Sequence, residues 1–368
     1  MNIAFLSLNQ EKLPDPVFPL GLLYLMANTP KSHEVQLWDL CFEERPLDYL
    51  TERLGLFKPD LIALGMRNIQ SADYSGVGHN LAQYEKVIAH LRAATRAPLI
   101  LGGSGFSVMP EKLMRHLKPD FGISGEGEVA FTQFLAQFET GAADYSGLAS
   151  FYWFEGGELK TQLRASSFTD LEVLKLPDFS LADPRYFSQV GTVNVQTKRG
   201  CPLKCTYCTY PTIEGAAKRM RSPQKVVDEM MAIRAQHPAT KHLFIVDSVF
   251  NLPKVHAKEV CRELIKRGWD IPWTCYINPL GFDLDTAQLL KSAGCVGIEI
   301  GSDSGSERVL SGLKKGFKVK QIRDLAALAQ AAGIKDCHSF ILGTPGETLA
   351  DVEESLGLID ELKPFCAI

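Results

Sequence analysis

Short apolar runs alternate with helix-like segments throughout the first 140 residues. Five runs have the pattern of strands, at residues 3–8, 35–40, 61–66, 98–101 and 121–124. Four segments between them place apolar residues at helical spacing, at residues 20–28, 47–57, 80–95 and 110–117. Strands that alternate with helices predict βαβ units and a parallel sheet. We therefore predict a Rossmann-like, doubly wound α/β domain over residues 1–140, whose ligand binds beyond the carboxyl ends of the strands.

The same alternation restarts after residue 190. Strand-like runs cover residues 192–197, 242–246, 273–277, 296–300 and 339–342. Helix-like segments cover residues 223–236, 254–267, 285–292, 319–332 and 348–362. These βα repeats predict a partial (β/α) barrel over residues 191–368, with its chemistry in the loops that follow the strands. A sixth strand could begin where the chain stops at Ile368, so we interpret the sequence as truncated at its C-terminal end.

Residues 141–190 have a different pattern and predict a linker. Apolar runs at 151–154 and 159–163 flank the sequence Glu155-Gly156-Gly157-Glu158. Two short runs separated by a glycine-containing turn predict a β-hairpin. Prolines then interrupt the chain at Pro177 and Pro184, which indicates an irregular crossing between the two domains.

Composition narrows the class of protein. The chain is 45% hydrophobic and 22% charged, as in ordinary globular proteins, and its net charge of −4 argues against a general nucleic-acid binder. Residues 1–8 read directly as a strand, so no signal peptide is expected, and no apolar run is long enough to span a bilayer. Nine cysteines, three of them clustered, favour a reducing cytoplasm and a metal site over a disulfide framework.

The clustered cysteines are Cys201, Cys205 and Cys208, spaced C-x3-C-x2-C in a loop directly after a predicted strand. No fourth cysteine or histidine lies nearby, whereas structural zinc commonly takes four protein ligands. Three thiolates instead suit an iron–sulfur cube that leaves one iron open to another ligand. The alternatives are a zinc knuckle or three unrelated buried thiols.

Glycine-rich loops follow three of the predicted strands in the first domain. The candidate ligand-binding residues in these loops are Gly65, Met66, Arg67, Gly102, Gly103, Ser104, Gly105, Gly125, Glu126 and Gly127. Glycines at such positions let a large ligand approach the backbone, although many glycine-rich loops only make turns. No G-x-G-x-x-G follows the first strand, so a nicotinamide site is not supported.

Taken together, these motifs resemble a known family. Three runs precede the three-cysteine loop: Pro19-Leu20-Gly21-Leu22-Leu23-Tyr24, then Gly102-Gly103, then Gly125-Glu126-Gly127-Glu128. In this order they resemble the radical S-adenosylmethionine (SAM) enzymes that carry a B12 (cobalamin)-binding domain, over nearly the whole chain. The resemblance implies a [4Fe–4S] cluster on Cys201, Cys205 and Cys208, SAM on the open iron, and cobalamin on the glycine-rich loops named above.

The resemblance also implies a set of contacts to SAM. These are Tyr207, Asp247, Ser248, Glu299, Ser302, Asp303 and Gly343. An acidic Asp247 suits the ammonium group of SAM. Asp303 matches a ribose contact, although it could instead cap a helix, and Gly343 matches an adenine contact. Tyr207 matches a position whose main chain meets adenine, but its ring could simply pack. Successive strand residues point to opposite faces, so Glu299 and Asp303 need not both reach the site.

One departure from related corrinoid domains concerns the lower face of cobalamin. The run D-x-H-x-x-G, which supplies a histidine ligand to cobalt in some of them, is absent. Arg67 is a candidate to face the cobalt there, and pairing of Arg67 with a nearby carboxylate is an equal alternative.

The reaction that the resemblance implies is methylation of an unactivated carbon, through a 5′-deoxyadenosyl radical and methylcobalamin, on a small-molecule or peptide substrate. A one-electron donor such as a flavodoxin or ferredoxin is then needed. Two alternatives stay open: cyclisation or rearrangement without net methylation, and a non-catalytic corrinoid or iron–sulfur binding module. A methylthiotransferase would need further cysteines in the first domain, where only Cys41 lies.

Basic residues near the cysteine loop could attract an anion; these are Lys198, Arg199, Lys204, Lys218, Arg219 and Arg221.

Overall fold

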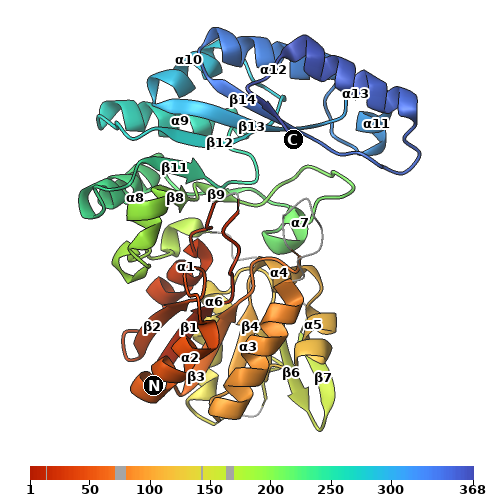
Figure 1. Cartoon of the computed structure of the whole chain (residues 1–368). Coiled ribbons are helices and arrows are strands. Elements are labelled where there is room, and N and C mark those ends of the chain that lie inside the picture. Colours follow the sequence, from red (N-terminus) through yellow and green to blue (C-terminus); the bar gives the residue numbers. More distant parts are fainter. Residues whose placement is uncertain (14, 71–79, 142–143, 163–169) are drawn as a thin grey trace. The chain divides into compact units, whose positions relative to one another are not determined.

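The structure is a computed structural model that describes residues 1–13, 15–70, 80–141, 144–162 and 170–368. It divides into two compact units, which are described one at a time (Figure 1). The first unit consists of Met1–Val190 with Thr212–Gly215, and the second of Gly191–Pro211 with Ala216–Ile368. No helix in the described residues combines the length and the apolar character that crossing a membrane requires.

The first unit is built on a seven-stranded sheet in the order β2-β1-β3-β4-β5-β6-β7. Its strands are β1 (Asn2–Ser7), β2 (Glu34–Asp39), β3 (Leu61–Gly65), β4 (Leu99–Gly102), β5 (Phe121–Ile123), β6 (Phe151–Glu155) and β7 (Glu158–Gln162). Strands β1 to β5 are parallel, as predicted. The predicted hairpin forms β6 and β7, and it extends the sheet antiparallel to β5.

Helices cover both faces of this sheet. They are α1 (Leu20–Asn28), α2 (Pro46–Phe57), α3 (Asn80–Ala94), α4 (Ser104–Val108), α5 (Pro110–Leu117) and α6 (Glu128–Phe138). On one face, α2, α3 and α5 pack against strand residues such as Leu6 and Leu64 in one hydrophobic core. On the other face, Phe5 of β1 contacts Phe131 of α6. The strand order 2-1-3-4-5 makes the sheet doubly wound, with its switch point between the carboxyl ends of β1 and β3.

Short irregular elements complete the first unit and lead to the second. The 3₁₀ turns are Leu171–Val173 and Phe179–Leu181, and a π-helical turn spans Tyr186–Val190. Asp178 caps its 3₁₀ turn by accepting the Ser180 N–H, which is the usual role of Asp at a helix start. A short helix, α7 (Tyr210–Ile213), follows the cysteine loop.

The second unit contains a six-stranded parallel sheet in the order β15-β14-β13-β12-β11-β8. Its strands are β8 (Thr192–Val195), β11 (His242–Ile245), β12 (Trp273–Ile277), β13 (Cys295–Asp303), β14 (Lys335–Phe340) and β15 (Cys366–Ala367). A separate two-stranded ladder pairs β9 (Lys198–Arg199) with β10 (Arg219–Met220). The helices are α8 (Pro223–Gln236), α9 (Lys254–Lys266), α10 (Leu284–Ser292), α11 (Glu307–Gly312), α12 (Val319–Ala331) and α13 (Leu349–Leu362). Consecutive strands are neighbours, as expected of a partial (β/α) barrel.

Two boundaries differ from the sequence prediction. The strand predicted at residues 339–342 is β14, which ends at Phe340 and begins earlier, at Lys335. It was misplaced because its buried positions are the polar residues Asp336 and His338, which interrupt the expected apolar pattern. Helices α4, α6 and α11 have no counterpart among the helical segments predicted from the sequence.

The two faces of the second sheet differ in burial. Fully buried residues alternate along the strands, as in Leu243 and Ile245 of β11 and in Ile298 and Ile300 of β13. The residues between them are only half-buried, as are Phe244 and Glu299. Because successive strand residues point to opposite faces, the first set packs under the helices and the second set forms the other face. We call this second face the open face.

Gly103→Ala is expected to destabilise the first unit. Gly103 has φ +102°, and a Cβ there would lie 2.5 Å from the backbone oxygen of Met66. The strained backbone costs about 1–3 kcal/mol, and overpacking against a backbone atom adds a similar amount, about 1–3 kcal/mol. Urea unfolding of the full chain would measure the loss. Gly55→Ala is the control, because Gly55 lies in α2 with nothing within 4 Å of a Cβ. It should stabilise the helix by up to about 1 kcal/mol; equal losses in both variants would contradict the prediction.

Candidate active site

The three cysteines of the loop lie close together after β9. Cys201 is buried, and Cys205 and Cys208 are half-buried. Burial raises the pKa of the Cys205 thiol and of the Cys208 thiol, and the negative charge of the neighbouring loop sulfurs raises each pKa further. Each sulfur therefore lies within the electrostatic range of the others. A bound metal would reverse this effect, because a coordinating thiol is deprotonated.

The loop does not have the geometry of a single-ion site. Within the described ranges, no three His, Cys, Asp or Glu side chains gather closely enough to hold one metal ion. A zinc knuckle needs its sulfurs about 2.3 Å from one central ion. An iron–sulfur cube binds each thiolate at a different iron, so its ligands stand further apart. The donor set of three neighbouring thiols in one loop fits a [4Fe–4S] cluster.

A buried ion pair holds the cysteine loop in place. The Tyr207 hydroxyl donates to Asp303 Oδ2 at 2.6 Å, and Lys315 Nζ donates to the Tyr207 oxygen at 2.9 Å. Lys315 Nζ also lies 2.6 Å from Asp303 Oδ2, and the two side chains are only 6% and 3% exposed. Beside them the Thr206 N–H donates to the carbonyl of Leu313 at 3.1 Å. We call Tyr207, Asp303 and Lys315 the loop anchor.

A β-bulge directs Asp303 toward this anchor. The register between β13 and β14 shifts between Gly301 and Asp303, and Asp303 takes the left-handed conformation with φ +63°. A bulge inserts one residue into a strand and re-aims the side chains that follow it. Asp303 thus reaches Tyr207, and Glu299 stays on the open face four residues earlier.

Lys315 was missed in the sequence. Leu313, Phe317 and Val319 are buried at alternate positions, and Lys315 occupies the same register. A lysine in a buried register is a signal of a paired charge. The partner could not be named from sequence, because Asp303 and Tyr207 are remote along the chain.

Asp247 follows β11 and is engaged with the backbone before the cysteine loop. It is fully buried, and its Oδ1 accepts the backbone N–H groups of Thr197 at 2.7 Å and Lys198 at 3.2 Å. Its Oδ2 accepts the Thr197 hydroxyl at 2.5 Å. Both oxygens are thus engaged inside the protein. The carboxylate therefore fixes the strand end that leads into the cysteine loop.

Ser302, Ser248 and Gly343 also have defined partners. The Ser302 hydroxyl lies fully buried, 2.7 Å from His338 Nδ1, so its side chain is turned away from the open face. The Ser248 hydroxyl donates to the carbonyl of Gly200 at 3.3 Å, next to the first cysteine. Gly343 has φ +81° and donates its N–H to Glu347 Oε2 at 2.5 Å, which forms a turn just after β14.

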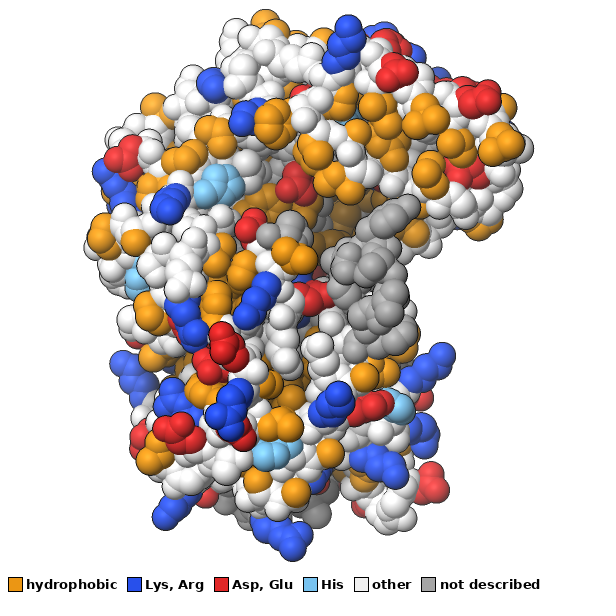
Figure 2. Space-filling model, viewed as in Figure 1, with side chains coloured by type: hydrophobic (Ala, Val, Ile, Leu, Met, Phe, Trp, Pro, Cys, Tyr) orange, Lys and Arg blue, Asp and Glu red, His pale blue; other side chains and the backbone are white. Residues whose placement is uncertain are grey.

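Most of the basic cluster around the loop is structural. Lys198 is buried, donates to the carbonyl of Phe250 at 2.5 Å and lies 3.7 Å from Asp247. Arg221 pairs with Glu229 at 2.5 Å. These two charges are neutralised inside the unit, so Lys198 and Arg221 do not contribute to an anion-attracting surface. Positive and negative side chains are interspersed on the visible face (Figure 2).

The glycine-rich loops of the first unit lie side by side, because β3, β4 and β5 are neighbours. The Met66 N–H donates to the carbonyl of Gly102 at 2.8 Å, and the Gly105 N–H donates to the carbonyl of Met66 at 3.0 Å. The Ser104 hydroxyl donates to the carbonyl of Arg67 at 2.8 Å. Glycines are needed here because the loops pack backbone on backbone. A Cβ on Gly105 would lie 3.0 Å from the Arg67 oxygen.

The remaining glycines of these loops have similar contacts. A Cβ on Gly65 would meet Leu22 at 2.9 Å, and one on Gly102 would meet the Ile123 oxygen at 3.4 Å. Gly125 has φ +75° and donates its N–H to the Ser107 hydroxyl at 2.8 Å. Glu126 and Gly127 follow and lead into α6. The glycines thus let these loops pack closely at the carboxyl ends of the strands.

Arg67 lies at the switch point of the sheet. Its Nη1 is 3.4 Å from Glu11 Oε2, and Asn68 Nδ2 donates to the same oxygen at 3.0 Å. The pairing with a carboxylate that the sequence left open is therefore present. The Arg67 side chain is still 39% exposed.

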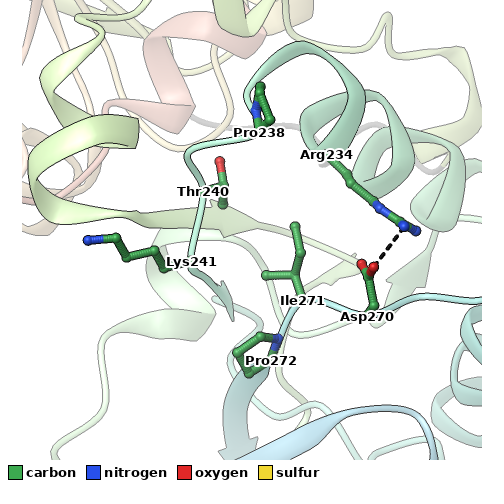
Figure 3. A pocket seen from close by; sticks show the side chains of 7 residues that line it. All are labelled: Arg234, Pro238, Thr240, Lys241, Asp270, Ile271 and Pro272. Atoms are coloured by element: carbon green, nitrogen blue, oxygen red, sulfur yellow. Dashed lines mark hydrogen bonds and ion pairs between the residues drawn. The ribbon is translucent and has the colours of Figure 1, made fainter.

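A cavity of about 400 Å³ lies in the second unit, and none of the predicted site residues lines it (Figure 3). Its lining residues are Arg234, Pro238, Thr240, Lys241, Asp270, Ile271 and Pro272. They precede β11 and β12, so the cavity is at the amino ends of these strands, and an ion pair of 2.7 Å joins Arg234 to Asp270 across it. Chemistry in (β/α) folds takes place at the carboxyl ends, where the cysteine loop lies.

Comparisons with known proteins agree with the fold and the order of the units. The B12 binding domain model matches residues 8–135, and the Radical SAM superfamily model matches residues 195–359. An uncharacterised methyltransferase of Pyrococcus horikoshii is 26% identical over 347 residues, covering 94% of this chain and 73% of that protein. The tryptophan 2-C-methyltransferase of Streptomyces laurentii is 26% identical over 422 residues, covering 96% of this chain and 70% of that protein.

Solved structures of TsrM, a radical SAM methyltransferase from Kitasatospora setae, have the same fold. The form with tryptophan substrate and a SAM analogue has a TM-score of 0.88 at 25% identity, covering 100% of this chain and 72% of that one. The form with cobalamin and a [4Fe–4S] cluster has a TM-score of 0.87 at 24% identity, covering 100% and 71%. Both domains are thus matched in the predicted order, and the three cysteines of the loop lie within the second match. The resemblance found in the sequence is confirmed: the chain belongs to the B12-binding-domain radical SAM family, whose enzymes use a [4Fe–4S] cluster, SAM and cobalamin.

Proposed function

We propose that this protein is a cobalamin-dependent radical SAM methyltransferase that methylates a carbon atom of a small molecule. The observation that carries the proposal is the pairing of two matched domains, over residues 8–135 and 195–359, with three neighbouring free thiols of one loop in the second. Two relatives that span most of the chain are named as methyltransferases, one of them for carbon methylation of tryptophan. Others of similar coverage are named as cyclases and are less similar in sequence overall. We propose residues 1–140, 141–190 and 191–368 as the cobalamin domain, the linker and the radical SAM domain.

When bound, the reduced cluster supplies the electron that cleaves SAM, and cobalamin carries the methyl group. Cys201, Cys205 and Cys208 would hold three irons of the cluster. Tyr207 and Asp303 would then border the SAM site, because the loop anchor joins them directly to the cysteine loop.

The other predicted contacts divide into two groups. Ser248 and Gly343 follow β11 and β14 and remain candidates for SAM; Ser248 also hydrogen-bonds to Gly200 beside the first cysteine. Asp247 would act through the backbone that it holds, whereas the buried Ser302 hydroxyl is engaged with His338. In the first unit, cobalamin would rest on Gly65, Met66, Arg67, Gly102, Gly103, Ser104, Gly105, Gly125, Glu126 and Gly127. A positive Arg67 near the lower face would discourage a ligand to cobalt there.

The partners follow from this chemistry. The substrate would be a small molecule, as tryptophan is for TsrM, or a peptide. A flavodoxin or ferredoxin would deliver single electrons, and nucleic acid would not be a partner. All nine cysteines are free, which suits a reducing cytoplasm.

The test follows the methyl group from SAM. The full chain, reconstituted without oxygen with iron, sulfide and cobalamin, would be given SAM with a deuterated methyl group, first alone and then with tryptophan as a trial substrate. We expect iron–sulfur absorption and labelled methylcobalamin, measured by visible spectra and mass spectrometry. A labelled carbon–methyl product supports the methyltransferase. Turnover to an unlabelled product would favour the cyclase, and a chain that binds cofactors but never cleaves SAM would be a binding module.

A further inference from the structure

A row of side chains crosses the open face of the second sheet. Asn194 of β8 is in register with Phe244 of β11, and Tyr276 of β12 is in register with Glu299 of β13. Glu299 is in turn in register with Cys337 of β14. All five are half-buried and lie at positions that alternate with the helix-facing core. The row therefore lines the interior of the partial barrel.

Glu299 is the acidic member of this row and has an uncharged partner. The Tyr276 hydroxyl hydrogen-bonds to its carboxylate. Among the ion pairs of the residues that the structure describes, none includes Glu299, whereas the nearby Asp303 is paired with Lys315. Burial raises the pKa of Glu299, and the Tyr276 hydrogen bond offsets this only in part. Burying a carboxylate without a cation is costly, so its presence here calls for a ligand that compensates it.

Tyr276 lies beside the carboxylate, and Phe244 of the neighbouring strand packs on the Tyr276 ring. Phe244 and Tyr276 meet edge to face, with ring centroids 5.0 Å apart and an interplanar angle of 79°. Aromatic faces attract cations, and a carboxylate makes charge-assisted hydrogen bonds to ammonium or guanidinium groups. An acidic substrate group would be repelled by Glu299. The row thus has the chemistry of a site for a positively charged nitrogen.

We propose that Glu299, Tyr276 and Phe244 bind a cationic nitrogen of the substrate, so that the methylated compound is an amine or a guanidine. This assigns Glu299 to the substrate instead of to SAM, and it rests on the proposed function. Glu299 lies four positions before Asp303, which is at most about 13 Å along a strand at 3.3 Å per residue, because a bulge intervenes. A substrate held by its nitrogen at Glu299 would extend toward the cysteine loop, where a carbon atom could react.

The test measures binding instead of turnover. The full chain, loaded with cluster and cobalamin but without reductant, would be titrated by calorimetry with tryptamine, agmatine and choline, and with indole-3-propionate as an acidic counterpart of tryptamine. We expect at least one cation to bind and the acid not to bind. Glu299→Gln should weaken the bound cation at least about tenfold, as loss of a charged hydrogen bond does. Glu353→Gln, on the exposed side of α13, is the matched control and should change nothing.

A second variant guards against misfolding. Tyr276→Phe keeps the ring but removes the hydroxyl that orients Glu299, and we expect a smaller loss, of about threefold, with an unchanged melting temperature. Three results would each overturn the proposal. They are failure of all three cations to bind at about 10 mM, equal binding of indole-3-propionate, and an unchanged affinity for the cation in Glu299→Gln. Repeating the titration on the cofactor-free chain tests the cation site independently of the proposed methyltransferase function. Glu299-dependent binding without any labelled methylcobalamin would leave the site standing and refute the methyltransferase.

Discussion

Cys205→Ala is expected to abolish the iron–sulfur cluster and with it all cleavage of SAM. Cys205 is the middle thiol of the loop, and its loss leaves two sulfurs, too few to hold a cube with one open iron. Loss of a residue that only supports a metal ligand costs roughly 10–100-fold in affinity or activity, so loss of the ligand itself should cost more. The measurements are bound iron and sulfide, visible absorption, and 5′-deoxyadenosine formed from SAM under reducing conditions.

Cys366→Ala provides the control for this experiment. Cys366 is also a half-buried free thiol of the second unit, but it lies on β15, outside the loop. The control variant should keep its iron and its SAM cleavage. Full iron content in Cys205→Ala, or equal losses in both variants, would show that the loop does not hold the cluster.

The pattern of apolar residues predicted most of the fold, for a physical reason. Strands of a parallel sheet covered by helices are buried on both faces, so they appear as continuous apolar runs such as the one in β3. The pattern failed at β14, where Asp336 and His338 fill buried positions. It also gave no sign that β6 and β7 would extend the first sheet, because pairing between distant strands is not encoded in local periodicity.

The candidate site divides in the same way. The cysteine loop could be found from spacing alone, because its three ligands are local in sequence. The loop anchor could not, because it joins Tyr207 to Asp303 and Lys315 through a bulge and a positive φ at Asp303. The sequence also suggested Asp247 as a contact to SAM. Only coordinates reveal that both of its oxygens accept hydrogen bonds from the protein.

Lys315→Met is expected to release the cysteine loop and to destabilise the second unit. The change keeps most of the side-chain volume but leaves Asp303, 3% exposed, without its cation. Breaking a buried pair by removing one partner costs about 3–5 kcal/mol, because the remaining charge stays buried. Urea unfolding of the full chain measures this loss. Hydrogen exchange should also rise at Thr206, whose N–H donates to Leu313, and the affinity for SAM should fall.

Two further variants separate the charge from the rest of the side chain. Lys320→Met removes an exposed lysine that pairs with Asp324 at 2.6 Å, and it should cost only about 0–1 kcal/mol. The double change Lys315→Met with Asp303→Asn removes both charges, so it should destabilise the protein less than Lys315→Met alone. If Lys320→Met cost as much as Lys315→Met, or if the double variant were the least stable, the buried charge pair would not be what holds Tyr207. The cysteine loop would then depend on the Thr206–Leu313 hydrogen bond and on the cluster itself.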